Sequence, residues 1–182
     1  EGARMRYLII GKSGQLTKEF QMLLGSRGED FVVLSRKEAD VGNYNQLNRV
    51  FVSYNPDVVF NCSAYNDVDG AETNYEEAFK VNTIGPYNLA LLCERHDALL
   101  VHYSTDYVFD GSKSDGLYTE DDKPNPLNKY GLSKLLGERF VLSTCPEVLL
   151  FRVSWVFGEG TQNFIHKVLN WAKEKDVLQI SM

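Results

Sequence analysis

A tyrosine and a lysine stand four positions apart in the stretch NKYGLSKLLGE, residues 128–138. Reducing a ketone requires a hydride on its carbon and a proton on its oxygen, and a tyrosine with an ordinary pKa of about 10 donates a proton reluctantly near neutral pH. On a helix, Lys134 lies one turn from Tyr130, where an ammonium group stabilises the tyrosinate, lowers the pKa of the phenol and can hold the ribose of a nicotinamide cofactor. A strand-end hydroxyl such as that of Thr105 can hydrogen-bond the substrate carbonyl. Tyr130, Lys134 and Thr105 therefore predict the catalytic group of a carbonyl reductase.

The position of this pair counts for more than its spacing, because a chain with 10 tyrosines can contain such a spacing by chance. Tyr130 opens a helical pattern that lies between two apolar runs, and the run before it ends in HYSTDYVFDG, residues 102–111. In a doubly wound sheet, ligands bind outside the carboxyl ends of the strands. The end of this run and the start of the helix are both expected there.

Short apolar runs rich in β-branched residues alternate with helical patterns along the chain. The predicted strands are residues 6–11, 31–35, 57–61, 98–104 and 148–153. The predicted helices are residues 15–25, 44–54, 75–95, 131–143 and 162–175. This alternation predicts an α/β fold, a doubly wound parallel sheet of the Rossmann type with helices on both faces.

Several local signals refine this prediction. Asn74 and Glu77 predict a capping box at the start of the third helix, and Gly85-Pro86 predicts a kink or a restart within it. Residues 105–126 are rich in Asp, Gly, Ser and Pro and predict a long functional loop. The stretch VLQI, residues 177–180, is typical of the opening of a sixth strand.

The first strand runs into GKSGQL, a glycine turn that opens a helix and is suited to a pyrophosphate. Gly11 allows the tight turn and Gly14 allows close approach of the backbone to phosphate. A third glycine is expected at position 17, where this chain has Thr17. About twenty residues further on, Ser35 and Arg36 stand where an NAD-selective site has an acidic residue, and a hydroxyl and a cation favour the 2′-phosphate of NADPH over NADH.

Length and composition indicate one domain. The chain has 182 residues and a net charge of −6, with no basic run and no apolar segment long enough for a membrane span, so neither a nucleic-acid nor a membrane partner is expected. Residues 1–4 are interpreted as a cloning remnant, and residues 5–182 as an NAD(P)-binding Rossmann-type domain. A cytoplasmic location is expected.

No metal site is predicted. The three cysteines, Cys62, Cys93 and Cys145, are far apart and lack ligand spacing, which indicates buried thiols in a reducing compartment. His102 lies within a strand and is expected to be a hydrogen-bonded core residue. Three acidic residues lie close together in the sequence, namely Asp67, Asp69 and Glu72. The other ligand positions of a calcium-binding loop are missing around them, so they are not expected to bind calcium.

The stretches GKSGQL, PDVVFN, VDGAE, HYSTDYVFDG, PLNKYGLSKLLGE and FRVSWVFG follow one another in this chain. In this order they resemble the dTDP-4-dehydrorhamnose reductase family of the extended short-chain dehydrogenase/reductase superfamily. The resemblance implies NADPH-dependent reduction of the 4-keto group of dTDP-4-dehydro-6-deoxy-L-mannose to dTDP-L-rhamnose, with NADH as the alternative cofactor. The implied process is dTDP-rhamnose and cell-surface polysaccharide biosynthesis.

The resemblance also assigns roles to single residues. Tyr130 is the implied proton donor, with Lys134 as its cofactor-binding partner, and Asn82 is expected to order the nearby helix. With Gly11 from the turn, the cofactor contacts are Gly14, Gln15, Leu16, Ser35, Arg36, Asp40, Val41, Ala64, Tyr65, Asn82 and Lys134. The contacts to the dTDP-sugar are Thr105, Asp106 and Trp155.

Two positions depart from the family pattern. Thr17 replaces the usual third glycine, and Asn66 stands where a threonine is common, so the contacts to pyrophosphate and nicotinamide are expected to differ in detail. Family members continue well beyond the equivalent of Met182. The C-terminal substrate domain is therefore expected to be missing from this chain.

Two other functions stay open from the sequence. A nucleotide-sugar 4,6-dehydratase or epimerase has the same fold, but dehydration commonly uses an Asp-Glu pair after the strand-end Thr, and here Asp106 is followed by Tyr107, a poor acid at neutral pH. An NADP-binding regulatory subunit resembling methionine adenosyltransferase subunit β can keep the same Tyr and Lys. A homodimer is compatible with the reductase prediction.

Overall fold

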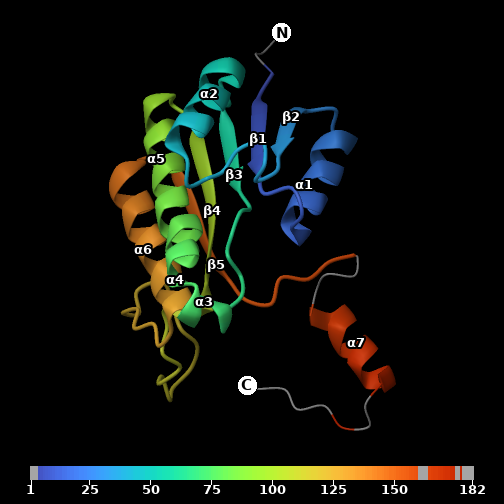
Figure 1. Cartoon of the computed structure of the whole chain (residues 1–182), viewed down its shortest axis with the longest axis vertical. Coiled ribbons are helices and arrows are strands. Elements are labelled where there is room, and N and C mark those ends of the chain that lie inside the picture. The colour runs from blue at the N-terminus through green and yellow to red at the C-terminus, as the bar shows by residue number, and fades with distance from the viewer. Residues whose placement is uncertain (1–3, 160–163, 175–176, 178–182) are drawn as a thin grey trace.

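The structure is a computed structural model that describes residues 4–159, 164–174 and 177. A five-stranded parallel sheet with the strand order β2-β1-β3-β4-β5 forms its centre (Figure 1). The strands are β1 (Arg6–Ile10), β2 (Asp30–Leu34), β3 (Val58–Asn61), β4 (Leu99–Thr105) and β5 (Val148–Val153). The predicted Rossmann-type α/β fold is confirmed, and no strand end differs from its prediction by more than one residue.

The chain changes direction across the sheet next to β1. From β1 it moves outward to β2, returns past β1 to β3, and continues to β4 and β5. Helix α1 (Gln15–Ser26) covers one face of the sheet, whereas α2 (Tyr44–Tyr54), α5 (Gly85–Arg95) and α6 (Lys129–Thr144) cover the other (Figure 1). In such a sheet the crevice for a ligand opens at the carboxyl ends of the strands that flank the change of direction, here β1 and β3.

The main hydrophobic core fills the layer between the sheet and helices α2, α5 and α6. Its strand and helix side chains are almost completely shielded from solvent; they include Leu8, Val59, Leu100, Phe51 and Leu89. On the opposite face, Phe20 of α1 stacks on Phe60 of β3 with ring centroids 4.2 Å apart. Burial on both faces explains why β1, β3 and β4 read as continuous apolar runs.

The predicted helix over residues 75–95 is interrupted. It consists of α4 (Tyr75–Phe79), one π-helical turn η1 (Lys80–Ile84), and α5, which restarts at Gly85-Pro86 as predicted. The predicted capping box is wrong, because the Asn74 side chain makes no capping hydrogen bond and Glu77 instead pairs with Arg36. A short helix before it, α3 (Gly70–Thr73), was not predicted.

The segment after β4 contains one 3₁₀ turn, η2 (Asp106–Val108), and no other regular element before α6. A carboxylate organises the loop: Asp110 accepts hydrogen bonds from the Ser112, Tyr118 and Asn125 side chains at 2.7–3.0 Å. These bonds hold the pKa of Asp110 well below its usual range. The predicted long loop is therefore an ordered part of the domain.

Helix α6 begins at a side-chain cap, where Asn128 Oδ1 accepts a 2.7 Å hydrogen bond from the Gly131 N–H. Its middle lies directly against η1: a Cβ atom at position 137 would overlap the carbonyl oxygen of Asn82. Gly137 thus permits the close approach of α6 to η1.

The last element is α7 (Phe164–Glu174), within the predicted range 162–175, of which residues 162, 163 and 175 lie outside the described residues. The predicted sixth strand also lies outside them, apart from Val177. Among the helices that the structure describes, none has both the length and the apolar content that a membrane crossing requires.

We expect Gly137→Ala to lower the free energy of unfolding by about 1–3 kcal/mol, because the methyl group forces α6 away from η1. Gly25→Ala in α1 is the matched control, since nothing lies within 4 Å of the position of its Cβ atom. The control should stabilise the protein slightly, by up to about 1 kcal/mol, through helix propensity. Urea unfolding of the two variants measures the difference, and equal stabilities would contradict the close-approach argument.

Candidate active site

A cavity of about 570 Å³ opens at the carboxyl ends of β1, β2 and β3. Most of the predicted cofactor contacts line it, namely Gly11, Gly14, Ser35, Arg36, Asp40, Val41, Ala64 and Tyr65. Residues that were not predicted line it as well, including Lys12, Ser13, Lys37 and Ser63. Asn66, which stands where a threonine is common in the family, also lines it. The fold therefore gathers three separate loops around one crevice.

The glycine turn between β1 and α1 is closed by Thr17. Gly11 has φ +104°, and a Cβ atom at this position would lie 2.8 Å from the carbonyl carbon of Cys62, so only glycine fits. The fully buried Thr17 donates its hydroxyl hydrogen bond to the Gly11 carbonyl oxygen. Where a third glycine is usual, this chain has a side chain that holds the turn together.

The N-terminus of α1 points an uncapped set of backbone N–H groups at this crevice. Gly14 is the N-cap residue of a 12-residue helix and supplies no side chain to accept from them, and the first turn carries no acidic residue. Free N–H groups and the positive end of the helix dipole suit a pyrophosphate. The residues present therefore fit the phosphates of a dinucleotide cofactor.

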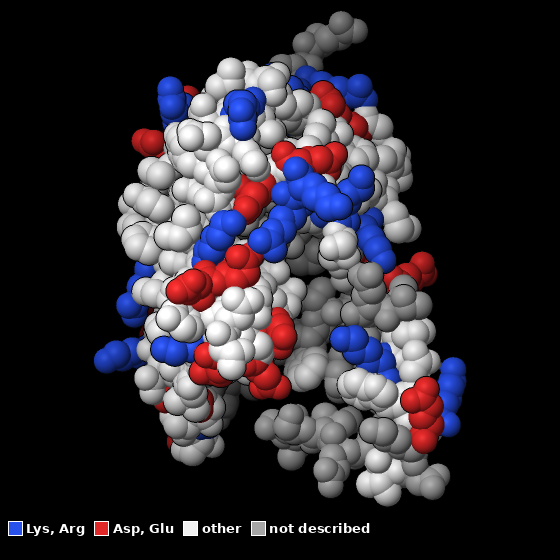
Figure 2. Space-filling view, viewed as in Figure 1, with Lys and Arg blue, Asp and Glu red and all other residues white. Residues whose placement is uncertain are grey.

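Basic side chains gather at the outer part of the cavity. Lys12 follows Gly11 in the glycine turn, and Arg36 and Lys37 follow β2. Figure 2 shows a cluster of Lys and Arg side chains on this face of the molecule. The sequence argument used only Arg36; the adjacent RK and GK dipeptides were the available signal for the two lysines. The cluster favours an anionic group such as a 2′-phosphate.

The predicted cofactor contacts Asp40 and Val41 are each held by a long-range hydrogen bond. Asp40 accepts a 2.6 Å hydrogen bond from Lys80 Nζ of η1. Asn88 of α5 donates a 2.9 Å hydrogen bond to the Val41 carbonyl oxygen. These contacts connect the segment after β2 to the helices on the same side of the sheet.

The predicted catalytic side chains meet at the end of β4. Tyr130 is 8% exposed. Burial raises the pKa of its phenol more than the neighbouring Thr105 side chain lowers it, so the expectation of a lowered pKa is wrong for the chain as it stands. A raised pKa keeps the phenol protonated near neutral pH but makes it a weaker acid than an ordinary tyrosine.

Lys134 lies one turn further along α6 and is 3% exposed. Its Nζ donates a 2.6 Å hydrogen bond to the Tyr103 carbonyl oxygen of β4. Burial lowers its pKa to about 8, and the charge of Glu138 opposes this only in part. The sequence predicted the position of the ammonium group, but its partner is a backbone carbonyl rather than the phenol.

Asn82 joins three parts of the site. Its Oδ1 accepts from the Tyr65 N–H at 2.9 Å, and its Nδ2 donates to the Tyr65 carbonyl oxygen and to Ser133 Oγ, both at 3.0 Å. It is 1% exposed. The side chain thus secures the loop after β3 against α6, in line with the predicted ordering role, and a direct cofactor contact of Asn82 stays a prediction.

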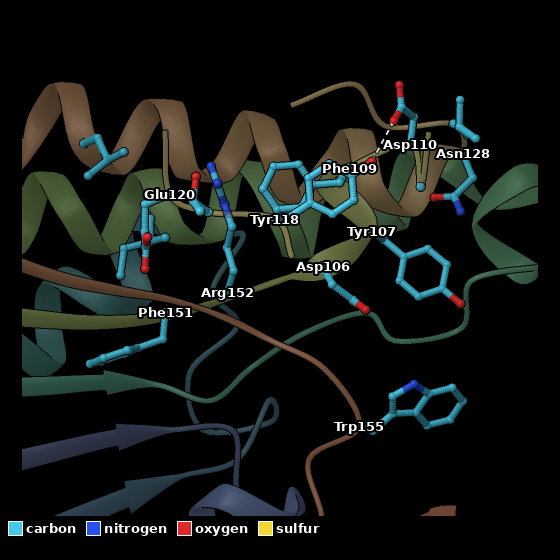
Figure 3. A pocket seen from close by; sticks show the side chains of 15 residues that line it. Asp106, Tyr107, Phe109, Asp110, Tyr118, Glu120, Asn128, Phe151, Arg152 and Trp155 are labelled. Atoms are coloured by element: carbon cyan, nitrogen blue, oxygen red, sulfur yellow. Dashed lines mark hydrogen bonds between the residues drawn. The ribbon is translucent and has the colours of Figure 1, made fainter. Parts of the chain in front are cut away.

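A second, larger cavity of about 1290 Å³ is lined by residues of β5 and of the loops that follow β4 and β5 (Figure 3). Its lining includes Tyr107, whose ring packs against Tyr130, but not Thr105, the third predicted substrate contact. Asp106 and Trp155, two predicted substrate contacts, line it from the ends of β4 and β5. Asp106 connects these strands, because its two oxygens accept from the hydroxyls of Thr105 at 3.1 Å and Ser154 at 2.7 Å. Trp155 is 59% exposed and has a left-handed φ of +49°. This cavity has room for a nucleotide-linked sugar.

Four predicted cofactor contacts do not line the cofactor cavity, namely Gln15, Leu16, Asn82 and Lys134. The Gln15 side chain instead donates to Glu19 Oε1 and to the Glu159 carbonyl oxygen, both at 2.9 Å. The contacts of these residues with a cofactor stay predictions.

In the core, His102 Nδ1 lies 3.1 Å from Asn61 Nδ2, as expected of a hydrogen-bonded core histidine. Within the described ranges, no cluster of three or more His, Cys, Asp or Glu residues could hold a metal ion.

The sequence matches the profile of the RmlD substrate binding domain over residues 5–182. The chain belongs to this family. The dTDP-4-dehydrorhamnose reductase of Aggregatibacter actinomycetemcomitans is 40% identical over 176 residues, which cover 96% of this chain and 60% of that protein. The family resemblance that the motifs indicated is thus confirmed.

Solved structures of RmlD relatives confirm the fold. A dTDP-4-dehydrorhamnose reductase from Clostridium acetobutylicum superposes with a TM-score of 0.90 at 38% identity, covering 94% of this chain and 61% of its own. The enzyme from Bacillus anthracis, solved in complex with NADP, gives a TM-score of 0.89 at 35% identity and covers 96% and 62%. This chain therefore spans about 60% of the length of the relatives that it matches.

We expect Thr17→Val to lower the free energy of unfolding by about 1–3 kcal/mol, because the Gly11 carbonyl loses a buried donor while the side-chain volume stays similar. Thr17→Ser keeps the hydroxyl and should cost about 1 kcal/mol, for the lost methyl group. Urea unfolding provides the comparison. A valine variant as stable as the serine variant would show that the hydroxyl does not hold the turn.

Lys134 should make stability depend on pH in one window. Its folded pKa of about 8 lies below the ordinary value of 10.5, so between these values the unfolded chain binds more protons and stability rises with pH. Relative to Lys134→Met, the free energy of unfolding of the wild type should increase by roughly 3 kcal/mol from pH 8 to pH 10.5. Urea unfolding of both proteins across this range measures the difference. If the free energies of unfolding of the wild type and of Lys134→Met changed equally with pH, the lowered pKa of Lys134 would be refuted.

Proposed function

We propose that this chain carries the cofactor site and the catalytic residues of an NADPH-dependent reductase of a nucleotide-linked 4-keto sugar. The substrate is dTDP-4-dehydro-6-deoxy-L-mannose and the product is dTDP-L-rhamnose. The observation that carries the proposal is the position of the buried Tyr130, one helical turn from Lys134. Tyr65 of the cofactor crevice packs against the cluster that contains Tyr130, and Tyr107 of the larger cavity packs edge-on against its ring. The names of the matched relatives support the choice of substrate.

Each residue has one task in the reaction. The reduced nicotinamide of the bound cofactor supplies the hydride that C4 of the sugar receives. Tyr130 transfers its phenolic proton to the C4 oxygen, which becomes the hydroxyl group of the product. The Thr105 hydroxyl, which donates to Asp106 in the free site, exchanges this bond for one to the C4 oxygen and orients the ketone. The Lys134 ammonium group holds the ribose and stabilises the tyrosinate that the proton transfer leaves behind.

The dehydratase alternative gains no support from the site. Both carboxylate oxygens of Asp106 are occupied by the hydroxyls of Thr105 and Ser154. The next residue is Tyr107, which packs edge-on against Tyr130 with ring centroids 5.7 Å apart. The arrangement offers one proton donor directed by one hydroxyl, which suffices for reduction but supplies no acid pair for the loss of water.

We expect Tyr130→Phe to lower the rate of ketosugar reduction by about 10²–10⁴-fold, because the ring stays but the proton donor is lost. Single-turnover oxidation of NADPH, with the protein in excess over NADPH and the dTDP-ketosugar at millimolar concentration, measures the chemical step despite weak substrate binding. Affinity for NADPH should be unchanged within about twofold, because the phenol carries no charge that the cofactor uses.

Tyr107→Phe is the matched control for the same experiment. It removes the phenol of the ring that packs edge-on against Tyr130 and should leave the rate within about threefold of the wild type. A Tyr130→Phe variant as fast as the wild type would refute the proton-donor role. Tight NADPH binding without turnover by the wild type would instead favour the regulatory-subunit function.

A further inference from the structure

The donor groups expected to hold a 2′-phosphate are already bound by carboxylates of the chain. Ser35 donates its backbone N–H and its hydroxyl to the same oxygen of Glu38, at 2.8 and 2.6 Å. Arg36 pairs with Glu77 of α4. Ser35 and Arg36 both line the cofactor cavity. An anion arriving at this position therefore meets donors that two carboxylates already use.

Of the two carboxylates, Glu38 is the stronger competitor. The Ser35–Glu38 contact closes a single turn after β2, in which the Glu38 and Ala39 N–H groups both donate to the Ser35 carbonyl oxygen, at 3.0 and 2.9 Å. The turn holds the carboxylate in place at little entropic cost. The Arg36–Glu77 pair joins distant segments, and the Arg36 side chain is 65% exposed. Exposed pairs of this kind contribute little and exchange partners readily.

Glu38 is an anion at neutral pH. The two hydrogen bonds from Ser35 hold the pKa of its carboxyl below the usual range, and the charge of Lys12 in the glycine turn adds to this effect. A phosphate at the same donors would therefore meet a fixed negative charge. The 2′-hydroxyl of NADH, by contrast, is a donor that a carboxylate accepts.

We infer that Glu38 is a specificity-determining residue that weakens the binding of NADPH relative to NADH, because its carboxylate occupies the Ser35 donors of the 2′-phosphate. The inference rests on the proposed function and adds to it. Lys12, Arg36 and Lys37 attract the 2′-phosphate, whereas Glu38 competes with it for the nearest hydrogen bonds. Cofactor preference is the difference between these two effects.

Binding constants test the inference without any turnover. The dissociation constants of NADPH and NADH are measured by nicotinamide fluorescence for the wild type, Glu38→Gln and Glu76→Gln. The Glu38→Gln variant should bind NADPH about tenfold more tightly, because a neutral amide is a weaker competitor for charge-assisted bonds. Its affinity for NADH should stay the same or fall by up to about twofold, because NADH has no 2′-phosphate and its 2′-hydroxyl loses a charged acceptor.

Glu76→Gln is the matched control. Glu76 is an exposed neighbour of Glu77 on α4, and its substitution changes the net charge by the same amount. It should alter each dissociation constant by less than about twofold, because surface charges at a distance are screened by salt. An equal gain in NADPH affinity from Glu76→Gln and Glu38→Gln would overturn the inference in favour of a general charge effect.

A double-mutant cycle adds a second criterion. Ser35→Ala removes the hydroxyl for which phosphate and Glu38 compete, so adding Glu38→Gln in that background should improve NADPH affinity only about threefold. Equal gains in both backgrounds would overturn the inference, as would a Glu38→Gln variant with unchanged preference. If the wild type binds neither cofactor, the proposed function fails. If the wild type binds both cofactors but the variants do not show the expected changes in affinity, the inference about Glu38 fails and the proposed function stands.

Discussion

The site depends on one constraint: α6 directs polar side chains into the protein, and each of them must find a partner there. Lys134 reaches a backbone carbonyl of β4, and Ser133 donates to the Tyr130 carbonyl oxygen while it accepts from Asn82. Glu138, 1% exposed, binds Arg152 of β5 through both oxygens at 2.9 and 2.7 Å. An unpartnered buried charge is strongly destabilising, so these contacts determine where α6 sits. The position of Tyr130 follows from them.

The site has two parts, a crevice for the cofactor and a larger cavity for the substrate. Loops after β1, β2 and β3 form the cofactor crevice, and the ends of β4 and β5 form the larger cavity. Asn82 and Asp106 act as connectors, the first between the β3 loop and α6, the second between β4 and β5. Tyr130 packs with Tyr65 of the crevice and with Tyr107 of the larger cavity, so a hydride donor in one and a ketone in the other could meet beside the phenol.

Opposing charges characterise the cofactor crevice. Three basic side chains line it, yet Asp40, Glu38 and Glu77 each bind a donor around its rim. Such an arrangement keeps the loops ordered in the free protein. It also means that cofactor binding exchanges one set of charge-assisted hydrogen bonds for another. The affinity for the cofactor is therefore the small difference between the free energy of the bonds that are lost and that of the bonds that are gained.

The sequence by itself determined the order of strands and helices, the glycine turn, the helical spacing of Tyr130 and Lys134 and the membership of the family, because these follow from local periodicity and contiguous motifs. It failed at the Asn74 cap and at the pKa of Tyr130. Only the tertiary structure decided that Glu77 binds Arg36, which is 41 positions away, and that burial outweighs the neighbouring groups at Tyr130. Pairing between distant segments and exclusion of water arise when the layers pack, and no local pattern in the sequence records either of them.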